Sequence, residues 1–179
     1  LVDDGSGGDS AAGDGLFSAV IPGQPAGTLV AFHLQATDAH AAPASRTFPS
    51  DAPAREGLVR FGETPSSGSF NDYRLWVTQA TLSRWASRLK LSNAGLDGTF
   101  VSGTNRVIYN VQALYAGSAY HASRYTTPTG VACDYKIVFP ADDPFLGGDE
   151  ATVVWPGLTG GDPVDTTAQQ EQTSYWVVS

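Results

Sequence analysis

Methionine is missing from all 179 residues, and cysteine occurs once, as Cys133. Because the first residue is Leu1 rather than methionine, we expect the chain to be a mature or excised piece of a longer protein. One cysteine cannot form an internal disulfide bond, and the Cys and His residues do not have the spacing of a zinc site. The fold is therefore expected to depend on side-chain packing and, where a metal takes part, on oxygen ligands.

Positive charge is also scarce. Lysine occurs twice, as Lys90 and Lys136, and ten Lys and Arg against 18 Asp and Glu give a net charge of −8. Negative charge repels nucleic-acid phosphate and anionic lipid, so neither is expected as a partner. No apolar run reaches the roughly 18 residues of a membrane-spanning helix, and the first residues lack the basic and apolar regions of a signal peptide. The acidic composition with few lysines favours a secreted bacterial protein.

What is present is the composition of a globular protein. Hydrophobic residues make up 41% of the chain and aromatic residues 11%, which argues against disorder throughout. A chain of this length can form one core or two small ones, and we expect two units. Residues 1–61 are predicted to be all-β, residues 62–69 to be a linker in a stretch rich in Ala, Pro, Ser and Gly, and residues 70–179 to combine helices and strands.

The first unit is expected to be the end of a β-sandwich. Residues 16–21 and 28–36 are strand-like runs joined by a Pro- and Gly-rich turn at residues 22–27. In the second run, alternation places the even-numbered side chains on the buried face: Val30, Phe32, Leu34 and Ala36. Because an isolated hairpin is marginal in water, we interpret these strands as the last ones of a sandwich whose first strands are missing.

The second unit is expected to contain two helices and a sheet. Thr78 starts the first helix, which is predicted to run to about Leu91 with one apolar face: Leu82, Trp85, Ala86 and Leu89. The second helix is predicted to follow Asp165 and to continue to Val178, with a capping-box pattern at its start: Thr166 or Thr167 and Gln169 or Gln170. Strands are predicted at residues 73–77, 99–102, 106–115, 134–139 and 151–155. The expected fold class is mainly β with two helices (α+β).

Four aspartates lie among the glycines of the first fifteen residues: Asp3, Asp4, Asp9 and Asp14. Glycine lets the backbone fold back tightly, which can gather carboxylates around a cation. Hard cations take several oxygen ligands, and calcium is the ion that this segment favours, although the spacing is not that of an EF-hand loop. The alternative is that the Asp-Gly pairs form turns in which the carboxylates accept backbone hydrogen bonds.

Three segments occur in one order in the second unit, namely residues 110–117 (NVQALYAG), 133–139 (CDYKIVF) and 142–147 (DDPFLG). This ordered set resembles the start of the spore-coat CotH kinase-like family. The resemblance implies a kinase N-lobe-like mixed sheet that follows the last strands of a fibronectin- or immunoglobulin-like sandwich. It also implies that Lys136 binds nucleotide phosphate, with Glu171 as its carboxylate partner.

The same resemblance implies that this chain has no catalytic residue of its own. The acids that hold magnesium and orient the acceptor hydroxyl in that family would lie beyond residue 179, so ATP and magnesium belong to the full-length parent. The chain alone is expected to be an inactive structural or binding module, with the rest of the parent chain, another protein or a polysaccharide as partner. By alternation, Lys136 is predicted on the solvent face of its strand, opposite Tyr135, Ile137 and Phe139.

Two other functions remain open from the sequence. An extracellular carbohydrate-binding or adhesion module would use aromatic rings as a sugar-stacking surface: Tyr115, Tyr120, Tyr125 and Trp155. A secreted serine hydrolase would use Ser118 and His121, although the chain lacks the Gly-x-Ser-x-Gly pattern of a nucleophile elbow.

Overall fold

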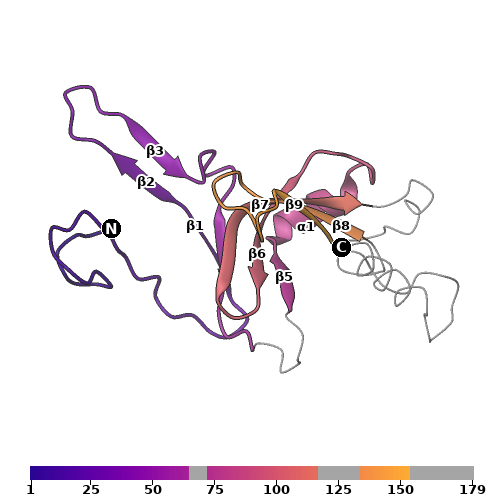
Figure 1. Cartoon of the computed structure of the whole chain (residues 1–179), viewed down its shortest axis with the longest axis horizontal. Coiled ribbons are helices and arrows are strands. Elements are labelled where there is room, and N and C mark those ends of the chain that lie inside the picture. Colours follow the sequence, from indigo (N-terminus) through magenta and orange to yellow (C-terminus); the bar gives the residue numbers. More distant parts are fainter. Residues whose placement is uncertain (65–71, 117–133, 154–179) are drawn as a thin grey trace, which may run out of the picture. The chain divides into compact units, whose positions relative to one another are not determined.

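The computed structural model describes residues 1–64, 72–116 and 134–153 (Figure 1). This part of the chain is mainly β, with one α-helix. The contacts divide the chain into two units, one made of residues 1–28 with residues 60–63, and the other of residues 29–59 with the residues from 64 onward. The predicted domain boundaries at residues 61 and 70 stay predictions.

The first unit is held together by backbone bridges rather than by a sheet. Val2 and Ser18 exchange two backbone hydrogen bonds of 2.9 Å. The predicted strand at residues 16–21 is wrong, because only this single bridge forms there. The physical reason is that a carboxylate competes for the backbone N–H groups, since Asp14 Oδ1 accepts a hydrogen bond from the N–H of Leu16 at 2.9 Å.

The predicted strand at residues 28–36 is divided into two strands at His33. Strand β1 (Leu29–Phe32) pairs with β4 (Gly57–Arg60), and β2 (Leu34–Thr37) pairs antiparallel with β3 (Ser45–Phe48). The even-numbered face is therefore buried only in part. Val30 and Phe32 are half-buried, whereas Leu34 and Ala36 are exposed, because no other described residues form a second layer over this face of the two-stranded ribbon of β2 and β3.

A five-stranded antiparallel sheet forms the centre of the second unit. Its strands follow the order of the chain: β5 (Tyr73–Trp76), β6 (Leu96–Ser102), β7 (Arg106–Ala116), β8 (Asp134–Val138) and β9 (Glu150–Val153). Each strand pairs antiparallel with the next, so the expectation of a mixed sheet is wrong for the described strands. The predicted hairpin turn after Ser102 is confirmed by the pairing of Ser102 with Arg106, since a three-residue connection joins antiparallel strands directly.

A β-bulge changes the alternation of side chains within β7. Asn110 has a φ of 59°, and the pairing with β6 shifts so that Gly98 is opposite Val111 and Phe100 is opposite Ile108. Asparagine tolerates this left-handed conformation better than most residues do. The extra residue places Ile108 and Val111 on the same face of the sheet, where both are fully buried.

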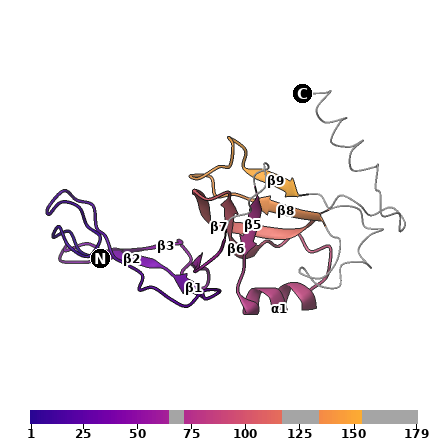
Figure 2. The same ribbon diagram turned by 90° about the horizontal axis from the view of Figure 1, so that it is seen from below.

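Helix α1 (Gln79–Ser87) lies against one face of the sheet (Figure 2). Thr78 is the N-cap as predicted, and its hydroxyl accepts a hydrogen bond from the N–H of Thr81 at 3.1 Å. The helix ends earlier than predicted, because the backbone is extended at Arg88. Trp85 is 1% exposed, but Leu89 is 85% exposed, so the predicted apolar face stops at the last helical turn.

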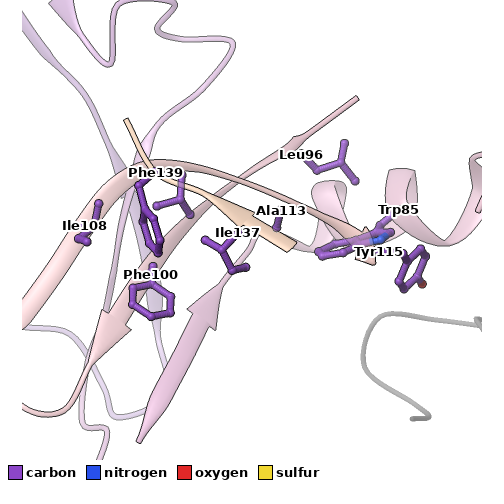
Figure 3. Close-up of a cluster of buried hydrophobic side chains, with 9 residues drawn as sticks. Trp85, Leu96, Phe100, Ile108, Ala113, Tyr115, Ile137 and Phe139 are labelled. Carbon is purple, nitrogen blue, oxygen red and sulfur yellow. The ribbon is translucent and has the colours of Figure 1, made fainter. Parts of the chain in front are cut away.

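The core of the second unit lies along one face of the sheet, and α1 contributes Trp85 at one end of it (Figure 3). The Trp85 ring packs against Tyr115 and Tyr135, with centroid distances of 5.3 and 5.8 Å. At the other end of the cluster, the rings of Phe100 and Phe139 lie 5.3 Å apart in an edge-to-face arrangement. Aromatic pairs in this geometry contribute beyond the area that they bury.

Arg55 and Leu58, which lie in a segment rich in small residues, contact the sheet from the face opposite the core. Leu58 is 1% exposed, and its N–H donates a hydrogen bond to the hydroxyl of Thr99 on β6 at 3.0 Å. The guanidinium of Arg55 donates to the carbonyl of Val111 on β7 at 3.2 Å. This packing was not predictable from the Ala-, Pro- and Ser-rich composition, because the packing depends on a few large side chains that lie between small ones.

Candidate functional site

The sheet places Lys136 on the face opposite the aromatic core. Lys136 is in the middle of β8, where it is opposite Leu114 of β7 and Thr152 of β9. Its neighbour Ile137 is 2% exposed and belongs to the core, which confirms the predicted alternation. The Lys136 side chain is 35% exposed, so part of it is accessible from solvent.

The carboxylate partner of Lys136 in the described part of the chain is Glu150. The Nζ atom of Lys136 lies 2.5 Å from Oε2 of Glu150, which is at the start of the neighbouring strand β9. Glu171, which the family resemblance implied as the partner, lies outside the described residues. Sequence reasoning missed Glu150, although antiparallel pairing of residues 134–139 with the apolar run that follows Glu150 would have brought the two strands together.

The ion pair can open at low cost. Glu150 is 55% exposed, and ion pairs between solvent-exposed side chains contribute between zero and about 1 kcal/mol. The structure thus shows a positively charged side chain on a rigid strand, held by one exchangeable carboxylate.

A second candidate site is formed by aspartates in the first unit. One carboxylate oxygen from each of Asp3, Asp9 and Asp14 lies within 4.8 Å of the others. Asp9 is 8% exposed, whereas Asp14 is exposed. Asp4 is outside this group, because the hydroxyl and the N–H of Ser6 donate to its carboxylate at 2.7 and 2.9 Å. Both hydrogen bonds lower the pKa of the Asp4 carboxyl group, and the bond from the Ser6 hydroxyl has the larger effect.

Backbone N–H groups hold two of these carboxylates in place. Asp3 accepts hydrogen bonds from the N–H groups of Gly13 at 2.7 Å and Gly15 at 3.1 Å, and Asp9 accepts one from Gly5 at 2.8 Å. The three glycines have positive φ values, which let the loop turn back on the aspartates. The turn-forming role that the Asp-Gly pairs indicated is therefore present, together with the gathering of carboxylates.

The geometry of the three carboxylates fits a hard cation. Calcium binds oxygen at about 2.3–2.6 Å, so two of its ligands are at most about 5 Å apart. The separation of 4.8 Å or less is within that limit. Three carboxylates at such distances repel each other, and a divalent cation would remove the repulsion that the backbone N–H groups only partly offset.

A cavity of about 270 Å³ lies beside the core of the second unit. Its walls come from α1 and from four strands, among them both edge strands β5 and β9. The lining is mostly apolar and aromatic: Tyr73, Arg74, Leu75, Val77, Leu82, Trp85, Phe100, Tyr135, Ile137 and Val153. The indole N–H of Trp85 is buried and has no hydrogen-bond acceptor among the described residues. Because Ile137 lines the cavity, the cavity is on the sheet face opposite Lys136.

The structure describes only one of the residues on which the other two predicted functions depend. Tyr115, a member of the predicted sugar-stacking surface, is 6% exposed and packs in the core. The other three aromatic residues of that surface and the pair Ser118 and His121 lie outside the described residues. Among the described residues, no helix has the length and hydropathy needed to cross a membrane.

No protein-family model, curated protein or solved structure matches this chain. Two arrangements offer specific chemistry, one a lysine held by an exchangeable carboxylate and the other a group of three aspartates. They are in different units.

Proposed function

We propose that this chain is the N-terminal portion of a secreted CotH-like protein and acts as a binding module that takes nucleotide phosphate at Lys136. The observation that carries the proposal is the ion pair between Lys136 and Glu150, on the sheet face opposite the core. A lysine on a strand, kept extended by a carboxylate, is the arrangement with which kinase-like folds contact nucleotide phosphates.

Burial and sheet pairing support this role for Lys136. Its strand has a neighbour on each side, so the position of the Cα atom is fixed by β7 and β9. Its side chain is neither buried nor fully exposed, and the Glu150 carboxylate holds its ammonium group. A charged group fixed in this way loses less conformational entropy when it binds an anion than a lysine at the end of a helix does.

The proposed activity is binding and not phosphoryl transfer. Transfer needs acidic side chains that hold magnesium next to the nucleotide and a carboxylate that orients the acceptor hydroxyl. We infer that neither role falls to a residue of this chain and that the full-length parent supplies both. Positioning a nucleotide without these groups leaves most of the reaction barrier in place.

The test is a titration of the whole chain with ATP, with and without magnesium, followed by calorimetry. Lys136→Met keeps the length and apolar part of the side chain and removes its charge. Lys90→Met is the matched control, because Lys90 is the other lysine and its ammonium group donates to the Ala86 carbonyl at the end of α1. We expect Lys136→Met to weaken ATP binding at least tenfold and Lys90→Met to leave it unchanged.

Equal losses in the two lysine variants, or no binding by the parent chain, would contradict the nucleotide proposal. A pull-down with insoluble polysaccharides, run on the same protein, separates the competing function. Retention of the chain on a polysaccharide, without any ATP binding, would instead favour an extracellular carbohydrate-binding or adhesion module.

A second function rests on the three aspartates of the first unit. We propose that Asp3, Asp9 and Asp14 bind calcium, since their oxygens are close enough to share one ion. The ion would add ligand bonds to a loop that is otherwise held by turns and one backbone bridge. Its role here is structural, because a cation that binds only the folded loop stabilises that fold by mass action.

A further inference from the structure

Thr152 places a hydroxyl group beside Lys136 on the same face of the sheet. It is directly opposite Lys136 in the pairing of β8 with β9, and it is exposed. Ala151, the residue before it, packs against the core, so the alternation of the strand directs Thr152 to the face of Lys136. Residues that are directly opposite in an antiparallel pair have Cβ atoms about 4.5–5.5 Å apart, which brings the two side chains within reach of one ligand.

The two sides of Lys136 differ in chemistry. On β7 its opposite residue is Leu114, which is apolar and 8% exposed, whereas on β9 it is Thr152. Within the described residues β9 is the last strand of the sheet, so no described strand covers the outer side of Thr152. An anion that contacts the Lys136 ammonium group is therefore expected to approach from the side of β9, where the hydroxyl group lies.

The ion pair of Lys136 indicates that an anion needs a second donor at this place. Lys136 and Glu150 form the pair, and together they carry no net charge. The pair therefore attracts an anion only weakly, and hydrogen bonds at short range have to supply the binding. A threonine hydroxyl donates one hydrogen bond without adding charge, and hydroxyl and ammonium groups are both usual donors to phosphate oxygens.

The apolar cavity of the second unit is on the other face of the sheet from this pair of donors. Ile137 and Val153 line the cavity, and each of them alternates along its strand with one of the two donors, Lys136 and Thr152. Pockets that hold a ring system are concave and mostly apolar. The sheet thus separates the donors for phosphate from the described cavity, so the contacts available at Lys136 are contacts to phosphate rather than to a base.

We propose that Lys136 and Thr152 form a site for a polyphosphate chain, in which the ammonium group and the hydroxyl group donate to oxygens of the same chain and the base is not recognised. The ligand class is that of nucleoside triphosphates with any base, together with inorganic tripolyphosphate. This inference rests on the proposed binding of nucleotide phosphate at Lys136. It adds Thr152 as a second binding residue and assigns the selectivity of the site to the phosphate chain.

Two substitutions of Thr152 test the role of its hydroxyl group. Thr152→Val keeps the β-branched shape of the side chain and removes the hydroxyl, whereas Thr152→Ser keeps the hydroxyl. Calorimetric titration of the full chain with inorganic tripolyphosphate measures the dissociation constant. We expect Thr152→Val to weaken binding roughly tenfold, the effect of losing one hydrogen bond to a charged group, and Thr152→Ser to bind like the parent. Thr104→Val is the matched control, because Thr104 is exposed in the turn between β6 and β7, and it should leave binding unchanged.

A comparison of three ligands tests the ligand class. ATP, GTP and tripolyphosphate are expected to bind the parent chain with dissociation constants within about threefold of one another, because the same two donors hold each of them. Binding of ATP that is stronger than this range, relative to both GTP and tripolyphosphate, would show that adenine is recognised. That result would overturn the assignment of selectivity to the phosphate chain.

The failure of this inference is distinguishable from the failure of the function on which it rests. Tripolyphosphate binding that Lys136→Met weakens and Thr152→Val leaves unchanged would overturn the role of Thr152 and keep Lys136 as a phosphate ligand. Equal losses in Thr152→Val and Thr152→Ser would overturn it as well, because the hydroxyl group would then not be the donor. If the parent chain bound none of the three ligands, both proposals would be wrong. Circular dichroism checks the fold of each variant, and Thr152→Ala replaces Thr152→Val if the latter does not fold.

Discussion

Ile108 and Val111 are three residues apart on β7, yet both side chains are buried in the same core. In a regular strand, residues separated by three point to opposite faces. The bulge at Asn110 adds one residue to β7 and so turns the rest of the strand over. Tyr109, displaced to the other face, packs edge-to-face on Phe32 at a centroid distance of 5.3 Å.

The bulge predicts that two substitutions at Asn110 affect stability to different extents. A β-branched residue is strained at a φ of 59°, and we expect Asn110→Val to lower the free energy of unfolding by about 1–2 kcal/mol. Glycine adopts this conformation freely, and the Asn110 Oδ1 atom has no hydrogen-bond partner among the described residues, so Asn110→Gly should be nearly neutral. Urea denaturation of both variants, with Gln112→Val as the control in the regular part of β7, measures the difference. A Val variant as stable as the Gly variant would contradict the bulge.

Truncation of Trp85 is expected to be the most damaging single change in α1. The ring is 1% exposed and contacts two tyrosine rings, and large-to-small changes of this kind cost roughly 3–5 kcal/mol. Leu89→Ala is the matched control, because Leu89 is 85% exposed and lies beyond the end of the helix. The measurement is the denaturation midpoint of the second unit. Similar midpoints for the two variants would mean that the Trp85 side chain is not part of the core.

Calcium is expected to raise the melting temperature of the first unit through its aspartates. A ligand at a hundred times its dissociation constant stabilises the folded state by about 2.7 kcal/mol. Asp9→Asn with Asp14→Asn should remove the effect, whereas Asp142→Asn with Asp149→Asn should keep it, since the latter pair is outside the group. Calorimetric scans in calcium and in chelator measure the shift. Equal shifts in the two double variants would exclude the site.

The lowered pKa of Asp4 predicts a pH effect with a definite sign. Hydrogen bonds from Ser6 favour the ionised carboxyl group, so its pKa in the folded chain is below the usual 3.8. The contribution of these bonds to stability is complete at pH values above the unfolded pKa and is lost as the pH falls through the folded value. NMR titration should show the Asp4 pKa rising in Ser6→Ala and unchanged in Ser10→Ala. A pKa unaffected by Ser6→Ala would mean that the Ser6 hydroxyl does not hold the carboxylate.

Periodicity predicted the parts of the fold in which one local pattern determines the structure. The local pattern was enough to predict that the helix starts at Thr78 and that Trp85 is buried. It was also enough to predict that Ile137 and Lys136 point to opposite faces of the sheet. The division of the strand at His33 was not predictable in this way, because it results from pairing with two strands that follow later in the chain. The bulge was not predictable from the sequence either, because asparagine tolerates a positive φ but does not require one.

The candidate sites were predictable to different degrees. The aspartates were identified from the sequence because all of them lie in one short glycine-rich segment, which can fold on itself. Glu150 was missed because its meeting with Lys136 depends on the register between β8 and β9. The cavity was missed for a similar reason, since its walls come from strands and a helix far apart in the sequence.

The hydrogen bonds from Arg55 and Leu58 to β7 and β6 also impose an order of events during synthesis. These bonds span 56 and 41 residues, and the ribosome releases Leu58 well before Thr99 and Val111 are made. Until the later strands arrive, Leu58 has no surface to cover and stays in contact with water or with other chains. Contacts over such sequence distances form slowly, because the intervening loop has to close first. The growing chain is therefore most prone to aggregation in the interval between the synthesis of β4 and that of β7.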